Sequence, residues 1–199
     1  FSNLQTSTLV IVNGALTQAV NNAATSQSKG IEFDFNARLL DGFSIKGEFT
    51  YLDSAFGDFQ NAPCFTGQSV AQGCVAGVQD LSGARNQFSP EYSGSVTATY
   101  VQSIGAWNLT IQPNVFFTDG YFLVGDNDPS QAQGKFAKIN LRISLSDADE
   151  RWQISLIGRN LNDKQTVSFC QDGFIAGPGS AACVPDVGAT YAIQARLNF

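Results

Sequence analysis

Four cysteines are the residues with the greatest capacity for chemistry in this chain of 199 residues. They form two local pairs, Cys64 with Cys74 and Cys170 with Cys183, and both pairs lie in stretches rich in glycine and polar residues. Four cysteines allow three disulfide connectivities, and we expect the local one, in which each disulfide staples its own loop. A metal site built from all four cysteines is the weaker alternative, because the C-x-x-C spacing typical of such sites is absent.

The chain contains no histidine. This excludes Ser-His-Asp and Cys-His catalysis and histidine-ligated zinc or haem, and no convincing pair of carboxylates replaces them. We therefore expect neither an enzyme nor a cofactor or metal site. Asp126-Asn127-Asp128 offers oxygens of the kind that Ca²⁺ binds, but a simple turn before Pro129 is the preferred interpretation. The net charge of −6 argues against a nucleic-acid partner.

The elements that carry these residues show a two-residue period. In residues 31–39 every odd position is apolar and every even position is polar or charged, which predicts a β-strand, because a helix would scatter such residues around its surface. Asp41-Gly42 follows, a strong signal for a tight hairpin turn. The next alternating run begins at Phe43, so the first predicted hairpin spans roughly residues 29–54.

Further alternating runs predict strands at about 92–100, 107–117, 137–145, 152–156 and 191–199, with a bulge at Pro113. Residues 1–12 predict an earlier, weaker strand with its own loop to Ser28. The total is about eight antiparallel strands. Their connections alternate strictly between long and short, which is typical of outer-membrane β-barrels.

The apolar side of these strands can face lipid in a membrane barrel or a protein core in a soluble sandwich. Lipid is favoured because the strands are long enough to cross a bilayer at a tilt and because the apolar side carries no charge on any clear strand. Aromatic residues also stand near both ends of the apolar side, as interfacial girdles do. These girdle residues are Phe43, Tyr51, Tyr92, Tyr100, Trp107, Trp152, Tyr191 and Phe199.

The opposite, polar side would then line a lumen. Its charged candidates are Arg38, Lys46, Glu48, Arg142, Arg159 and Arg196, which we expect to pair with one another or with a plug more often than with a ligand. Five loop aromatics are candidates for ligand contact: Phe59, Phe65, Tyr121, Phe122 and Phe174. Packing of the loops against each other is an equally simple role for them, and the one we favour.

Several ordered stretches resemble the C-terminal part of TonB-dependent outer-membrane receptors. They are residues 28–32, Leu40-Asp41-Gly42-Phe43, Tyr51-Leu52-Asp53, Asp80-Leu81-Ser82-Gly83 before Ser89-Pro90, and residues 158–164, followed by a final strand that ends in an aromatic residue. The resemblance covers nearly the whole chain. It departs at Gln194, where the assembly signal of the terminal strand usually has glycine.

This resemblance implies that residues 1–199 form the last eight strands of a 22-stranded barrel, in the outer membrane of a Gram-negative bacterium. The plug domain and the TonB-contact motif would lie outside this sequence, which begins at Phe1 and so reads as a processed product or a fragment. The implied partners are outer-membrane lipid, TonB through the missing N-terminal part, the barrel-assembly machinery through the C-terminal strand, and a scarce ligand such as a siderophore, cobalamin or oligosaccharide.

Two other architectures fit the same pattern. About eight strands are enough to close a small barrel by themselves, which would make the chain a self-contained structural protein of the outer membrane. A soluble β-sandwich that binds a ligand is the less favoured alternative.

Overall fold

The computed structural model describes residues 2–12, 15–172 and 180–198, with side-chain burial given from residue 25 onward. One antiparallel sheet of eight strands dominates these residues, and its strand order follows the sequence. The predicted all-β, antiparallel fold is thus confirmed. The strands are β1 (Ser2–Val12), β2 (Ala15–Leu40), β3 (Phe43–Phe56), β6 (Tyr92–Ile104), β7 (Trp107–Thr118), β10 (Phe136–Asp147), β11 (Trp152–Arg159) and β14 (Thr190–Leu197).

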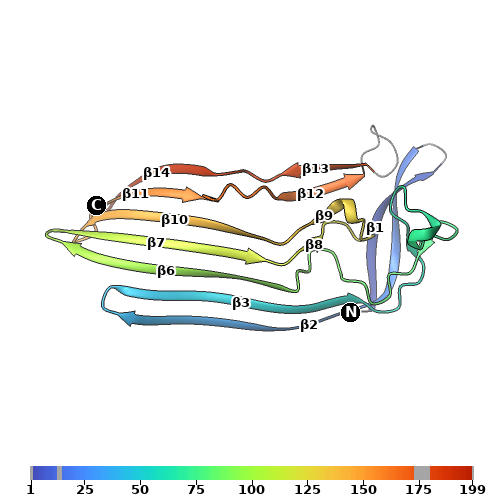
Figure 1. The fold of residues 1–199 in the computed structure, drawn as a ribbon, viewed down its shortest axis with the longest axis horizontal. Coiled ribbons are helices and arrows are strands. Elements are labelled where there is room, and N and C mark those ends of the chain that lie inside the picture. Colours follow the sequence, from blue (N-terminus) through green and yellow to red (C-terminus); the bar gives the residue numbers. More distant parts are fainter. Residues whose placement is uncertain (1, 13–14, 173–179, 199) are drawn as a thin grey trace.

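Short turns join the strands at one end of the sheet and long loops join them at the other (Figure 1). In the turn Asp41-Gly42, Gly42 has a φ of 74°, a value that glycine adopts without strain. The long connections, named here by their residues, are loop 57–91, loop 119–135 and loop 160–189. They contain three two-stranded sheets and two 3-10 turns: β4 (Ala62–Pro63) with β5 (Val78–Gln79), β8 (Tyr121–Phe122) with β9 (Ala132–Gln133), β12 (Val167–Asp172) with β13 (Ala181–Pro185), η1 (Val70–Gln72) and η2 (Pro129–Gln131).

The first hairpin differs from the sequence prediction. Strand β2 begins at Ala15, where a loop as far as Ser28 was expected. Strand β1 pairs with the first part of β2, up to Thr25, and β3 pairs with the remainder, from Ser26 to Leu40. Figure 1 therefore shows β1 at the long-loop end, beyond the other strands. The loop prediction rested on missing alternation, but ladder hydrogen bonds join backbone groups and do not require it.

The apolar residues of neighbouring strands stand opposite one another. Phe33 pairs with Phe49, Val96 with Val115 and Leu156 with Ile193. We call the side that they share the apolar face and the opposite side the polar face. Large side chains on the apolar face are exposed, with 69% of Ile31 and 58% of Phe33 accessible.

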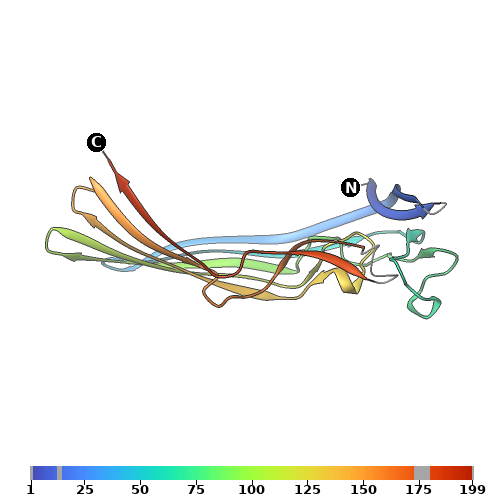
Figure 2. The same cartoon turned by 90° about the horizontal axis from the view of Figure 1, so that it is seen from above.

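The sheet is a single, open, curved layer (Figure 2). Contacts along its strands run between hydrogen-bonded neighbours, and no other element among the described residues packs extensively on the apolar face. A sandwich would need a second sheet there, so that alternative is wrong for this fold. Strands β1 and β14 lie at opposite edges, so the described strands do not form the small closed barrel either.

The predicted bulge at Pro113 is also wrong. Pro113 pairs with Leu141 in an unbroken β7–β10 register. On its other side, the β6–β7 pairing stops at Thr97 and Asn114, omits two residue pairs, and resumes at Tyr100 and Ile111 without a register shift. Proline therefore removes a ladder hydrogen bond here without adding a residue to the strand.

Most of the predicted girdle residues are placed in pairs on the apolar face. Phe43 lies opposite Tyr100, near the short turns, and Tyr51 lies opposite Tyr92, near the loops. The rings of Trp107 and Trp152 meet edge to face, with centroids 6.4 Å apart. Tyr191 stands opposite Gly158, and Phe199 lies outside the described residues. Their role at a membrane interface remains a prediction.

Among the helices of the described residues, none has the length and apolar character needed to span a membrane.

Candidate functional site

The charged residues predicted to line a lumen all lie on the polar face, at the register positions expected for them. Arg142 donates hydrogen bonds to Gln194 Oε1 at 2.8 Å and to Ser155 Oγ at 3.0 Å. Arg38 forms an exposed ion pair with Asp41 in the turn, at 3.1 Å. Within the described part of the chain no ion pair joins these charged residues to one another. Pairing with a plug stays a prediction.

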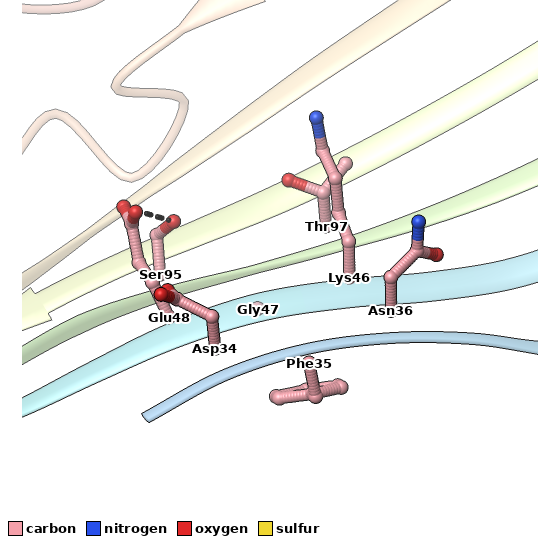
Figure 3. Close-up of a pocket in the computed structure, with 8 residues that line it drawn as sticks. All are labelled: Asp34, Phe35, Asn36, Lys46, Gly47, Glu48, Ser95 and Thr97. Atoms are coloured by element: carbon pink, nitrogen blue, oxygen red, sulfur yellow. Dashed lines mark hydrogen bonds between the residues drawn. The ribbon is translucent and has the colours of Figure 1, made fainter. Parts of the chain in front are cut away.

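A shallow hollow of about 550 Å³ lies on the polar face over β2, β3 and β6. Figure 3 shows Asp34 and Glu48 at one end of it and Lys46 at the other, with Phe35 pointing to the opposite side of the sheet. Glu48 accepts a hydrogen bond from Ser95 Oγ at 3.0 Å. The hollow is open and mixed in charge, which suits contact with another protein surface better than enclosure of a small ligand.

Both predicted disulfides are present. Cys64 and Cys74 are joined in loop 57–91, with Cα atoms 5.7 Å apart. Cys170 and Cys183 are directly paired residues of β12 and β13 in loop 160–189. Each bond closes its own loop, so the local connectivity expected from the sequence is confirmed.

A buried network of polar side chains, which we call the loop network, ties the three long loops together. Gln131, with 1% of its surface exposed, donates through Nε2 to Asp172 at 2.6 Å and to Asp128 at 3.2 Å. Thr66 of loop 57–91 also donates a hydrogen bond to Asp172. From the same loop, Gln79 Nε2 donates to the backbone oxygen of Asp126 at 2.9 Å. The loops therefore hold each other in place mainly through hydrogen bonds.

Three carboxylates of the loop network are buried without a basic partner among the described residues: Asp126, Asp128 and Asp172. Burial, with Asp172 and Asp128 nearby, raises the pKa of Asp126 to about 6, although the backbone N–H of Asp128 opposes the rise. Asp128 also caps η2 by accepting from the backbone N–H of Ser130, so the preferred turn interpretation is confirmed. No group of carboxylate and thiol side chains in the described residues is arranged to hold a metal ion.

A second pocket, the aromatic pocket, lies where the polar face meets the loops. It has a volume of about 530 Å³ and is lined by Phe88, Pro90, Ser93, Phe116, Thr118, Tyr121, Phe136, Lys138 and Asp186. The rings of Phe116 and Phe136 have centroids 5.9 Å apart, and those of Phe88 and Tyr121 are 6.2 Å apart. Two aromatic pairs therefore provide apolar surface on a side of the sheet that is otherwise polar.

An ion pair lies within the aromatic pocket. Lys138 Nζ is 3.3 Å from Asp186 Oδ2 and 5.3 Å from the centroid of the Phe136 ring. Asp186 also accepts from Thr166 Oγ1 at 2.5 Å, and this hydrogen bond, followed by the contact with Lys138, keeps its pKa below the ordinary value despite partial burial. The carboxylate therefore stays charged at neutral pH, and the pocket combines apolar rings with a fixed pair of charges.

The five predicted loop aromatics have different surroundings. Phe59, 4% exposed, packs with Phe56, Ala62 and Leu81 in a small core inside loop 57–91, which agrees with the favoured role in loop packing. Tyr121 lines the aromatic pocket. Phe122, its neighbour in sequence, and Phe65 of loop 57–91 are both half-buried. Phe174 lies outside the described residues.

Five residues of the aromatic pocket were not predicted as a group: Phe88, Phe116, Phe136, Lys138 and Asp186. A signal was available for two of them. In Val115-Phe116-Phe117 and in Phe136-Ala137 an aromatic residue occupies the position of the polar face, so the two-residue alternation breaks. The other three come from three different segments, which only the folded chain brings together.

Comparison with known proteins identifies one matching family model, described as "TonB dependent receptor-like, beta-barrel", over residues 1–161. No curated protein matches the chain.

Three solved structures share this fold. The ferric yersiniabactin uptake receptor FyuA from Yersinia pestis is 20% identical, with a TM-score of 0.67 over 91% of this chain and 25% of that one. The siderophore receptor PiuA from Acinetobacter baumannii is 18% identical, with a TM-score of 0.61 over 85% and 21%. BauA, the ferric preacinetobactin receptor of the same organism, is 14% identical, with a TM-score of 0.60 over 96% and 25%. The chain thus spans about a quarter of the length of these structures.

Proposed function

Because this chain belongs to the TonB-dependent receptor-like β-barrel family, we propose that it forms part of the wall and outer loops of a receptor that imports a siderophore-class ligand. The observation that carries the proposal is the position of the aromatic pocket. It opens on the polar face, directly beneath loops held together by the loop network and two disulfides. A ligand captured by the loops would meet this pocket on its way along the polar face.

The apolar face supports a place in the outer membrane. Many large side chains of this face are exposed, among them Ile31, Phe33 and Ile193. Large contiguous apolar patches are rare on proteins that face water on all sides, whereas the lipid-facing side of a membrane barrel is an apolar band. We infer that lipid covers this face and that β14 delivers the chain to the barrel-assembly machinery, with Gln194 in place of the usual glycine. The long loops then face outside the cell.

We further infer that the whole receptor contains a plug, which would lie against the polar face, and a motif that contacts TonB. The hollow in Figure 3, with Asp34 and Glu48 at one end and Lys46 at the other, offers charges to such a plug. Transport would then depend on TonB pulling on the plug, while this part of the wall and its loops keep their shape. No chemical conversion of the ligand is required.

Uptake measurements test this function directly. The full-length protein is expressed in a Gram-negative strain that lacks its own siderophore receptors, and entry of radioactive iron is measured for a panel of ferric chelates. We expect at least one chelate to enter only when the protein is present, and entry to stop in an otherwise identical strain without TonB. Entry of no chelate, or entry independent of TonB, would refute the proposal.

A further inference from the structure

We propose that the aromatic pocket recognises a ligand group that joins a flat aromatic ring to an anionic oxygen, with Lys138 as the partner of that oxygen. The proposal rests on the proposed receptor function and specifies the chemistry of the ligand. It follows from the contacts around Lys138 and from the rings that line the pocket.

The rings supply the first half of the recognition. Phe88 keeps 53% of its surface exposed, and Phe116 is also exposed, although each of them meets one other ring of the pocket. An exposed aromatic side chain can bind another flat ring favourably. The contact removes water from the surfaces of both rings and adds edge-to-face or offset-stacked contacts. The pocket, with a volume of about 530 Å³, has room for such a ring.

Lys138 supplies the second half. An ammonium group has three N–H donors, and Lys138 uses one of them in a hydrogen bond to Asp186 while its Nζ also lies over the Phe136 ring. Asp186 has a second partner in Thr166, and its backbone N–H donates to the Thr166 backbone oxygen at 2.8 Å. Asp186 therefore stays anchored if Lys138 turns toward a ligand, whereas Lys138 keeps donors available for an anion.

The surrounding charges do not oppose an anion. Glu91 and Asp119, the other acidic residues at this end of β6 and β7, are both held by Arg85, at 2.9 Å and 3.1 Å. Burial and the charge of Asp186 raise the pKa of Tyr121, so its phenol remains a neutral hydrogen-bond donor. The pocket thus offers the Lys138 ammonium group and the Tyr121 hydroxyl group next to flat apolar walls.

Binding of three related probes tests the proposal. Purified full-length protein in lipid nanodiscs is titrated with 2-naphthoate, with the neutral alcohol 2-naphthalenemethanol, and with the saturated acid decahydro-2-naphthoate; empty nanodiscs correct for partition into lipid. The binding measurement does not need TonB. Probe binding can therefore fail while uptake succeeds, and uptake can fail while the probe binds, so the two proposals are tested separately. We expect 2-naphthoate to bind more tightly than either of the other probes.

Two substitutions that break the same ion pair separate recognition from a merely structural role. Lys138→Gln should weaken 2-naphthoate binding about tenfold, the size of one charged hydrogen bond, and leave the alcohol within about twofold. Asp186→Asn should keep 2-naphthoate binding or strengthen it, because it removes the competitor for Lys138. Lys135→Gln, which removes an exposed charge outside the pocket, should have no effect.

The aromatic walls are tested in the same way. Phe136→Leu should weaken both naphthalene probes, while Phe169→Leu, at an exposed phenylalanine of β12, should weaken neither. The proposal is overturned if Lys138→Gln and Asp186→Asn weaken 2-naphthoate equally, if the saturated acid binds as tightly as the aromatic acid, or if no probe binds.

Discussion

The loop network should lose stability as pH rises, the reverse of the usual behaviour of an aspartate. Asp126 has a pKa of about 6 in the folded chain and 3.8 as its ordinary value. Between these two values the folded loops hold a proton that the opened loops release, so raising the pH favours opening. The stabilisation is fully present below pH 3.8 and is lost as pH rises through about 6.

The magnitude follows from the same two values. Their difference corresponds to about 3 kcal/mol, or roughly a hundredfold change in the equilibrium between closed and opened loops. Asp126→Asn should remove the effect, because an amide of the same shape stays neutral at every pH. At pH 7 this variant should therefore hold loop 119–135 closed more firmly than the natural residue does.

Hydrogen exchange followed by mass spectrometry measures this opening. Protection of peptides from loop 119–135 is compared across the pH range 4–8, after correction for the intrinsic pH dependence of exchange. Asp58→Asn, at an exposed position of loop 57–91, is the matched control and should behave like the natural chain. The reasoning is refuted if protection increases with pH, or if Asp126→Asn retains the same pH dependence.

Two further predictions concern loop 160–189 and the sheet. Replacing Cys170 and Cys183 together by serine should make loop 160–189 cleavable by external protease, since a disulfide that closes a loop of this size stabilises it by about 3 kcal/mol; cleavage rates equal to those of the intact disulfide would contradict this. Gly94→Ala should reduce the yield of folded protein in the membrane, because the added Cβ would lie 2.5 Å from the backbone oxygen of Glu48 and 2.8 Å from the Phe117 ring. Ala98→Ser, at another position of β6 on the apolar face, is the control, and equal yields of the two variants would show that the sheet adjusts at Gly94.

The strands were predictable because their two sides contact different surroundings. Residues 31–39 alternate strictly, and this alternation alone fixes which side chains share a face. The disulfides were predictable because each cysteine has a partner nearby in sequence. By contrast, the alternation that predicts β1 is weak, and the first part of β2 carries no clear alternation at all, so nothing in residues 15–27 distinguishes a paired strand from a loop.

The loop network could not be predicted for a different reason. Thr66, Gln131 and Asp172 belong to three loops that are far apart in sequence. Their side chains are ordinary loop residues, and none has a spacing that marks a partner. These side chains come within hydrogen-bonding distance only where the folded loops meet at the long-loop end of the sheet. Burial at that place raises the pKa of Asp126.

The aromatic pocket lies between these two cases, and it indicates how such a sequence can be read further. Phe116 and Phe136 stand at polar positions of strands that otherwise obey the alternation. A large apolar residue exposed on a wet face gains nothing from the strand itself, so its presence requires another contact. In the folded chain that contact is partly each other's ring, at 5.9 Å, and partly Lys138. An aromatic residue out of phase near the loop end of a barrel strand therefore marks a place where other side chains gather, and here it leads to the residues that the uptake and binding experiments should change first.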